Sequence, residues 1–298
     1  RQQRETMFKQ EKEITDRQPH DNDYINECFN MQELKSALQQ IKKNTTPGED
    51  TICYDMIKNL HNNALQVILD LYNNIWTTGN IPTSWKHAIV LPKHKADKPK
   101  SDPQSYRPIA LTSTLNKLME KLIANRITWF MEKNKLFNNR QSGFRKGRGT
   151  TDQILRLQDS IFKAINNKQM CIAIMFDFEK AYDMLHKEGL LHKISKMGLN
   201  GNIYNWIDNF LTNRTFQVKV GSSMSSNQIL ENGTPQQTSP YNATSDSNET
   251  MLSKQFFNIS TTNGNMNGQQ TRRDDTTDQF NQQYQEKSNI EPISGKTK

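Results

Sequence analysis

The sequence is poor in cysteine, in long apolar runs and in hydrophobic residues generally. Its three cysteines lie far apart and match no CxxC or disulfide pattern, which favours isolated thiols in a reducing compartment. No apolar run approaches the roughly 18–20 residues that span a bilayer, and no signal peptide is present, so we expect an intracellular protein, nuclear or cytoplasmic. Hydrophobic residues make up 33% of the 298 residues and the mean hydropathy is -0.88. This polar average predicts that part of the chain lacks a core.

The charge balance is basic. Lysine and arginine number 39 against 31 aspartates and glutamates, which gives a net charge of +8. Such an excess fits a polyanionic partner, although many basic proteins bind no nucleic acid. The chain starts at Arg1 rather than at methionine, and we expect it to be an excerpt of a longer product.

Apolar spacing and composition divide the chain into four parts. Residues 1–30 are polar and charged and predict a linker from an upstream region. Residues 31–85 carry apolar positions at helical spacing and predict a helical N-terminal extension. Residues 86–236 mix helices with short strands, among which Met170–Phe176 is the clearest buried strand. Residues 237–298 are rich in Asn, Gln, Ser and Thr without an apolar period, which predicts a disordered tail.

Further elements are predicted inside the third part. They are a strand at His87–Leu91, helices at Leu115–Met131 and Ile154–Ile165, and a hairpin of Phe216–Val220 with Met224–Leu230 around Gly221.

Asp177 directly follows the predicted strand Met170–Phe176. A strand that ends in a carboxylate can hold a negative charge rigidly at a sheet edge, and Mg²⁺ prefers oxygen ligands of this kind. In two-metal phosphoryl transfer one ion activates the attacking hydroxyl and the other stabilises the leaving group. An aspartate at this place is also a common cap of the next turn or helix. From the residues alone both interpretations stay open.

Several stretches, taken in order, resemble the reverse transcriptase of non-LTR retrotransposons, closest to the jockey-like group. They are TPGEDTICYDMIKNL (46–60), SYRPIALTSTLNKLMEKLIANRI (105–127), QSGFRKGRGTTDQ (141–153), FDFEKAYD (176–183) and ENGTPQ (231–236). The resemblance implies an α/β (α+β) right-hand polymerase fold, with fingers and an incomplete palm after a helical N-terminal part. It also implies an RNA template, a DNA primer and deoxynucleoside triphosphates as partners.

The resemblance implies a role for each residue that matches the family's catalytic motifs. Asp177 would be the first metal-binding aspartate of a two-Mg²⁺ site, with the backbone carbonyl of Phe178 as a further ligand. Tyr182 would exclude a ribose 2′-hydroxyl and so select deoxynucleotides. Gln236 would lie beside the nucleotide sugar and the template base.

The basic residues of the same motifs would contact phosphates. Lys93 and Arg107 match the finger residues that hold the incoming triphosphate, and both side chains suit phosphate oxygens. A solvated basic loop is the alternative reading of this pair. Arg145, Lys146 and Arg148 would contact the template or primer backbone, which is a salt-sensitive interaction independent of base sequence.

One family motif is missing from this sequence. The family uses a Tyr-x-Asp-Asp hairpin for its remaining metal carboxylates, whereas the one Asp-Asp pair here, at 274–275, follows two arginines. A single carboxylate cannot fix two Mg²⁺ ions. The sequence therefore predicts an RNA-directed DNA polymerase by descent that is inactive as this chain, with a frameshift or mis-spliced exon after Gln236 as a hypothesis. A catalytically dead nucleic-acid-binding module and a pseudogene product are the alternatives, and the oligomeric state is left open.

Overall fold

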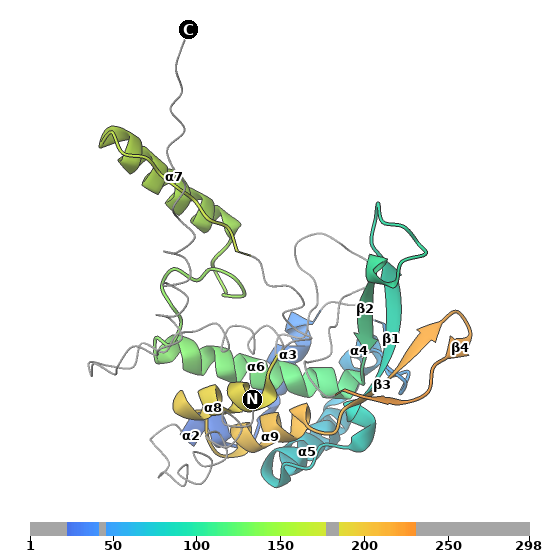
Figure 1. Ribbon diagram of the computed structural model, residues 1–298. Coiled ribbons are helices and arrows are strands. Elements are labelled where there is room, and N and C mark those ends of the chain that lie inside the picture. The colour runs from blue at the N-terminus through green and yellow to red at the C-terminus, as the bar shows by residue number, and fades with distance from the viewer. Residues whose placement is uncertain (1–22, 42–45, 177–184, 231–298) are drawn as a thin grey trace. The chain divides into compact units, whose positions relative to one another are not determined.

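The computed structural model describes residues 23–41, 46–176 and 185–230 as a mixed α/β structure (Figure 1). The helices are α2 (Asp23–Asn26), α3 (Met31–Gln40), α4 (Tyr54–Lys58), α5 (Asn62–Thr78), α6 (Thr114–Lys133), α7 (Thr150–Asn166), α8 (Lys187–Lys196) and α9 (Asn202–Leu211), with short 3-10 helices at Thr83–Lys86 and Pro103–Ser105. The strands are β1 (His87–His94), β2 (Tyr106–Leu111), β3 (Thr215–Val220), β4 (Ser223–Met224) and β5 (Gln228–Ile229).

Helix α6 lies in the middle of the hydrophobic core. Ser113 caps its first turn by accepting a hydrogen bond from the Asn116 backbone N–H. The apolar side predicted from the sequence is buried, as shown by Leu118, Ile123 and Ile127, all fully enclosed. Helices α2 and α3 pack against α6, while α5 and α8 pack against α9. The prediction of a long helix at this place is confirmed.

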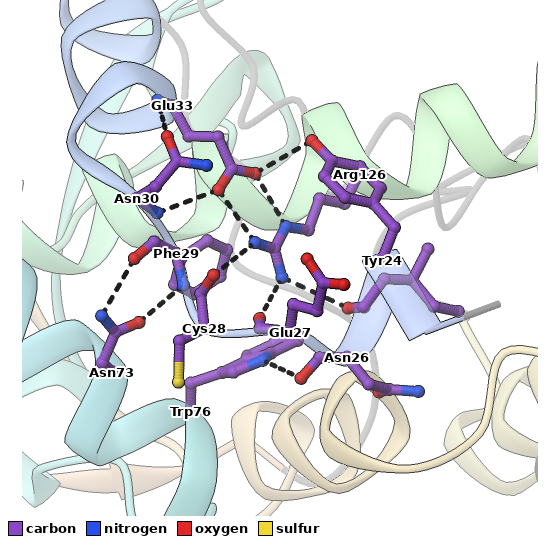
Figure 2. Close-up of polar contacts among 11 residues, drawn as sticks. Tyr24, Asn26, Glu27, Cys28, Phe29, Asn30, Glu33, Asn73, Trp76 and Arg126 are labelled. Atoms are coloured by element: carbon purple, nitrogen blue, oxygen red, sulfur yellow. Dashed lines mark hydrogen bonds and ion pairs between the residues drawn. The ribbon is translucent and has the colours of Figure 1, made fainter.

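The core extends into the segment that the sequence predicts to be a linker. Residues 23–26 form α2, and Ile25 and Phe29 are buried among the core residues. Asn73 of α5 clamps this segment, because its side chain accepts from the Phe29 N–H at 2.7 Å and donates to the Phe29 carbonyl at 3.0 Å (Figure 2). Residues 23–30 hold four hydrophobic residues, Tyr24, Ile25, Cys28 and Phe29, but they belong to no longer apolar period, so the linker prediction overlooked this packing.

Arg126 of α6 joins the N-terminal segment to the core (Figure 2). Its guanidinium binds the Glu33 carboxylate through Nε at 2.8 Å and Nη2 at 2.9 Å. The remaining N–H groups donate to the backbone carbonyls of Ile25, Glu27 and Cys28. Although burial alone would raise the pKa of Glu33, the hydrogen bonds from Arg126 and the Asn30 backbone lower it. Arg126 is buried as a cation because every N–H of its guanidinium has an acceptor.

A mixed sheet lies beside the helical core, with strands in the order β2-β1-β3-β4 and with β5 also paired to β3 (Figure 1). β1 and β2 are antiparallel, whereas β1 and β3 are parallel. The strand predicted at 87–91 and the turn of the hairpin around Gly221 are confirmed, with Lys219 of β3 opposite Met224 of β4. The second strand predicted at 224–230 is instead divided into β4 and β5, which both pair with β3. Gly221 has a φ of 60°, a backbone conformation that favours glycine in the turn.

The prediction of a buried strand at Met170–Phe176 is wrong. These residues form no strand, and Met170, Ile172 and Phe176 are more than four-fifths exposed. Extended backbone becomes a strand only beside a hydrogen-bonded neighbour, and no described strand pairs with this segment. Its β-branched and apolar composition indicates a preference for extended backbone, but no described strand lies beside it to pair with it.

Helix α7 is confirmed at the predicted place, but its apolar face is not buried. Ile154, Phe162 and Ile165 are each more than half exposed.

The described helices include none that is long and apolar enough to cross a membrane. Cys28, Cys53 and Cys171 are free thiols, as their spacing predicted.

Removing the Arg126 guanidinium should destabilise the fold strongly. Arg126→Met keeps the apolar stem but removes the cation beside Glu33 and the donors to three carbonyls, so we expect a loss of about 3 kcal/mol in the free energy of unfolding. Urea unfolding followed by far-UV circular dichroism measures this change.

Lys133→Met is the matched control on the same helix. The Lys133 ammonium lies 4.5 Å from the Trp129 ring centroid at the surface, so its loss should cost no more than about 1 kcal/mol. Equal losses in the two variants would contradict the special role of Arg126.

Candidate functional site

Two predicted triphosphate-binding residues lie opposite each other in the sheet. Lys93 of β1 is the register partner of Arg107 of β2, and both side chains are exposed. Directly opposite residues of an antiparallel pair have Cα atoms about 4.5–5.5 Å apart and project from the same face. Two like charges in this arrangement repel each other, and an anion placed between them would relieve that repulsion.

The loop that joins β1 to β2 is held against the strands by polar contacts. The Lys95 backbone N–H donates to the Ser105 carbonyl at 2.7 Å, and the Lys95 ammonium donates to the Gln104 carbonyl at the same distance. The Tyr106 hydroxyl donates to the Lys100 carbonyl at 3.0 Å, and the Tyr106 ring packs edge-on against the His94 ring. These contacts shape the basic loop between the two strands.

Gly48 joins two of the motif stretches in space. A Cβ on Gly48 would lie 2.5 Å from the Thr112 carbonyl carbon and oxygen and 2.8 Å from the Ser113 nitrogen. Only glycine allows the backbone of the 46–60 stretch to approach so closely to the junction between β2 and α6. Tyr72 of α5 supports the same junction by donating its hydroxyl hydrogen to the Leu115 carbonyl at 2.7 Å.

The three basic residues predicted to contact nucleic-acid backbone lie in different surroundings. The Arg145 guanidinium binds the Glu132 carboxylate at 2.7 Å and lies 4.7 Å from the centroid of the Phe137 ring, and its side chain is only 7% exposed. It also donates to the Asn138 carbonyl at 3.0 Å. This geometry gives Arg145 a structural task in the loop, which its sequence context did not reveal.

Arg148 and Lys146 differ from Arg145. Arg148 donates through Nη1 to the Asn139 carbonyl at 2.6 Å and is half-buried. Lys146 is exposed. Arg156 of α7, which the sequence analysis did not single out, donates to the same Asn139 carbonyl at 3.1 Å. The backbone carbonyls of this loop are thus satisfied by arginines on both sides of it.

The predicted catalytic residues Asp177, Phe178 and Tyr182, and Gln236 near the tail, lie outside the described residues. In the three described ranges, no group of three or more His, Cys, Asp or Glu side chains is placed to hold a metal ion. The Mg²⁺ site at Asp177 therefore stays a prediction.

Two charged residues that the sequence analysis missed are deeply buried between the helices and the sheet. Glu120 of α6 and Arg214, which immediately precedes β3, are each 1% exposed. Burial raises the pKa of Glu120 to about 7, against the opposing effects of Arg214 and Lys117. A sequence signal for Glu120 existed, since a carboxylate there interrupts the apolar run of α6 between Met119 and Leu122.

Comparisons with known proteins agree with these motifs. A family model described as reverse transcriptase (RNA-dependent DNA polymerase) matches residues 93–244, about half of the chain. The probable RNA-directed DNA polymerase from transposon BS of Drosophila melanogaster is 34% identical over 206 residues, which cover 69% of this chain and 23% of that protein. The RNA-directed DNA polymerase from mobile element jockey of the same species is 32% identical over 206 residues, covering 69% of this chain and 22% of that protein.

A third relative has a similar extent. The probable RNA-directed DNA polymerase from transposon X-element of Drosophila melanogaster is 33% identical over 208 residues, which cover 70% of this chain and 23% of that protein. The chain thus spans less than a quarter of the length of these relatives. The ordered motifs, the mixed α/β structure and the family match together identify the chain as a member of the reverse transcriptase (RNA-dependent DNA polymerase) family, of the non-LTR retrotransposon kind.

Proposed function

We propose that the chain binds the incoming deoxynucleoside triphosphate and the template–primer of an RNA-directed DNA polymerase. The observation that carries this proposal is the cross-strand pair of Lys93 and Arg107, exposed on one face of the β1–β2 hairpin. A triphosphate is a compact polyanion, which suits a planar guanidinium fork beside a mobile ammonium. The solvated-loop reading explains the exposure of the two side chains but gives no reason for their direct opposition.

In the proposed reaction the protein's part is to hold and orient the substrates. Lys93 and Arg107 would bind the phosphates, and Tyr182 would exclude a ribose 2′-hydroxyl. Asp177 and the Phe178 carbonyl would hold Mg²⁺, which when bound activates the primer 3′-hydroxyl and stabilises the leaving pyrophosphate. Asp177 alone cannot fix two ions, because each needs several oxygen ligands. We therefore propose that this chain binds substrates but does not extend a primer.

The second candidate is a nucleic-acid-binding module without catalysis. The net charge of +8 and the exposed Lys146 favour contact with a phosphate backbone. The two proposals differ in one measurable property. The polymerase reading requires binding of a magnesium–deoxynucleotide complex, whereas the binding module requires only an affinity for nucleic acid that falls steeply with salt.

Loss of either basic residue of the hairpin should weaken triphosphate binding. We expect Lys93→Ala and Arg107→Ala each to raise the Kd for a magnesium–deoxynucleoside triphosphate about tenfold, because each removes a charge-assisted hydrogen bond to phosphate. Fluorescence anisotropy with a labelled deoxynucleotide measures the Kd.

Lys98→Ala is the control for a general loss of charge, because Lys98 lies exposed in the loop of the same hairpin. Its Kd should stay close to that of the unsubstituted chain. The proposal fails if Lys98→Ala weakens binding as much as the two strand variants do, or if none of the three variants changes the Kd.

Arg145 and Lys146 should separate stability from nucleic-acid binding although they are neighbours. Arg145→Ala breaks the pair with Glu132 and exposes Phe137, so we expect the free energy of unfolding to fall by about 1–3 kcal/mol. Lys146→Ala should leave stability within about 0.5 kcal/mol, as for other surface substitutions.

The binding measurement completes this comparison. Lys146→Ala should weaken binding to an RNA–DNA hybrid and lower the slope of log K against log salt by about one. An unchanged slope in Lys146→Ala would remove Lys146 from the proposed nucleic-acid surface.

A further inference from the structure

Glu120 of α6 and Arg214, just before β3, are two deeply buried residues of opposite charge. The Glu120 carboxylate accepts a hydrogen bond from the Asn116 side chain at 2.7 Å through Oε1. The Arg214 guanidinium donates to the Phe210 carbonyl at 3.0 Å and lies 4.5 Å from the centroid of the Phe210 ring. Within the described part of the chain, Oε2 of Glu120 and Nε and Nη2 of Arg214 have no hydrogen-bond partner. One acceptor and two donors are thus left in the same buried region.

The two charges act on each other. The pKa of Glu120 is raised mainly by burial, and Arg214 is the strongest influence that lowers it. Burial lowers the pKa of Arg214 to about 10, which Glu120 opposes, so Arg214 remains a cation near neutral pH. Lys117 also lowers the pKa of Glu120, and Glu120 in turn raises the pKa of the buried Tyr54 phenol beyond the effect of burial.

Further charged groups surround Arg214. The pKa values of Lys86 and Lys187 are lowered, first by burial and then by Arg214. Asp208 of α9 partly offsets this for Lys86, and Glu188 does so for Lys187. Two lysines therefore respond to the charge of Arg214, and Glu120 is the anion to which Arg214 itself responds.

Arg214 stands where three strands meet. Its carbonyl accepts from the Leu230 backbone N–H at 2.8 Å, just after β5. The next residue, Thr215, opens β3 and is the register partner of both His87 in β1 and Ile229 in β5. The Thr215 hydroxyl also lies 2.9 Å from Nδ1 of His87. Arg214 is therefore one residue away from the pairing of β3 with both β1 and β5.

β1 connects this strand pairing to the predicted triphosphate-binding residues. From His87 the strand runs on to Lys93, opposite Arg107. We propose that Arg214 is a positioning residue, whose buried guanidinium is attracted by the Glu120 carboxylate of α6, holds the start of β3 toward α6 and thereby sets the place of the β1–β2 hairpin. The last step, from the hairpin to nucleotide binding, rests on the function proposed above.

A charged pair serves this purpose better than apolar packing. Apolar side chains of similar volume often give equal or greater stability at such a site. They act only at van der Waals distance, whereas two opposite charges attract each other over a longer range inside a protein. The two charges therefore draw the start of β3 toward α6 at some cost in stability.

The sign of the pH dependence follows from the raised pKa of Glu120. Below about pH 7 the carboxylate is protonated and its attraction to Arg214 is lost. Because the folded pKa lies above the ordinary value of 4.5, the protonated carboxyl favours the folded state, so overall stability falls as the pH rises from there to about 7. The attraction between the Glu120 carboxylate and Arg214 changes in the opposite direction from overall stability. It grows as the pH rises and is present mainly above pH 7.

The test is a double-mutant cycle on the full chain with Glu120→Gln and Arg214→Met, at pH 6 and pH 8.5. Hydrogen exchange, corrected for intrinsic rates, reports the protection of amides in β1 (88–90) and β3 (216–218). We expect Arg214→Met to lower this protection about tenfold at pH 8.5 and clearly less at pH 6. In the Glu120→Gln background the loss of protection caused by Arg214→Met should be smaller than with Glu120 present. It should also be the same at pH 6 and pH 8.5.

Controls keep the proposal open to refutation. Lys219→Met removes an exposed positive charge from β3 itself and should leave the exchange unchanged. If Arg214→Met does not fold, Arg214→Lys takes its place in the cycle; since it keeps the charge, its loss of protection relative to Arg214 should be smaller than tenfold at pH 8.5, and this loss should shrink at pH 6 only when Glu120 is present. An equal loss in both backgrounds, or no loss in β1, overturns the positioning role.

Nucleotide binding is measured on the same samples and separates the two proposals. If the unsubstituted chain binds no magnesium–deoxynucleoside triphosphate while the exchange coupling is present, the proposed function fails and the positioning role stands. If the chain binds nucleotide but the exchange coupling is absent, the positioning role fails alone.

Discussion

The guanidinium of Arg126 is the contact on which the N-terminal half of the described fold depends. It binds Glu33 of α3 and three carbonyls around α2 at the same time, and it lies 4.2 Å from the centroid of the Phe29 ring. No apolar side chain could satisfy those carbonyls, which would otherwise be buried without donors. Glu33 also completes the capping box of α3 with Asn30. One arginine therefore links the start of α3, the segment after α2 and the central helix α6.

The two buried arginines illustrate different uses of the same side chain. Arg126 has an acceptor for each N–H and a directly bonded carboxylate, which makes it a fixed part of the core. The Arg214 guanidinium donates to the Phe210 carbonyl, and it interacts with Glu120 without a direct ion pair among the described residues. A cation whose N–H groups all have acceptors is held rigidly, as Arg126 is. Arg214 has fewer hydrogen bonds, so the position of β3 depends more on its attraction to Glu120. This contrast separates the helical core from the sheet that carries the candidate site.

The position of the candidate site follows from that sheet. A parallel pairing with β3 holds the first half of β1, and an antiparallel pairing with β2 brings Lys93 opposite Arg107. Close contact between Gly48 and the Thr112–Ser113 junction then ties the hairpin's return strand to the helical region. The motif stretches at 46–60 and 105–127 are thus parts of one structural unit.

Sequence patterns predicted the elements whose signals are local. The apolar period of α6, the strand at 87–91 and the turn at Gly221 depend on neighbouring residues, and all three are present in the structure. The strand prediction at Met170–Phe176 failed because a strand depends on a partner from elsewhere in the chain. Arg145 belongs to a motif stretch whose resemblance implies contact with the nucleic-acid backbone, and this contact stays a prediction. Its contacts with Glu132 and Phe137 were not revealed by its sequence context.

The sequence by itself determined the family, since ordered motifs of specific residue types are a linear property of the chain. It also determined which residues can bind phosphate, because charge and donor number belong to the side chain. Only the tertiary structure decided which basic residues face solvent and which are enclosed. It alone paired Lys93 with Arg107 and placed Glu120 near Arg214, because strand register and burial arise from contacts between residues far apart in sequence.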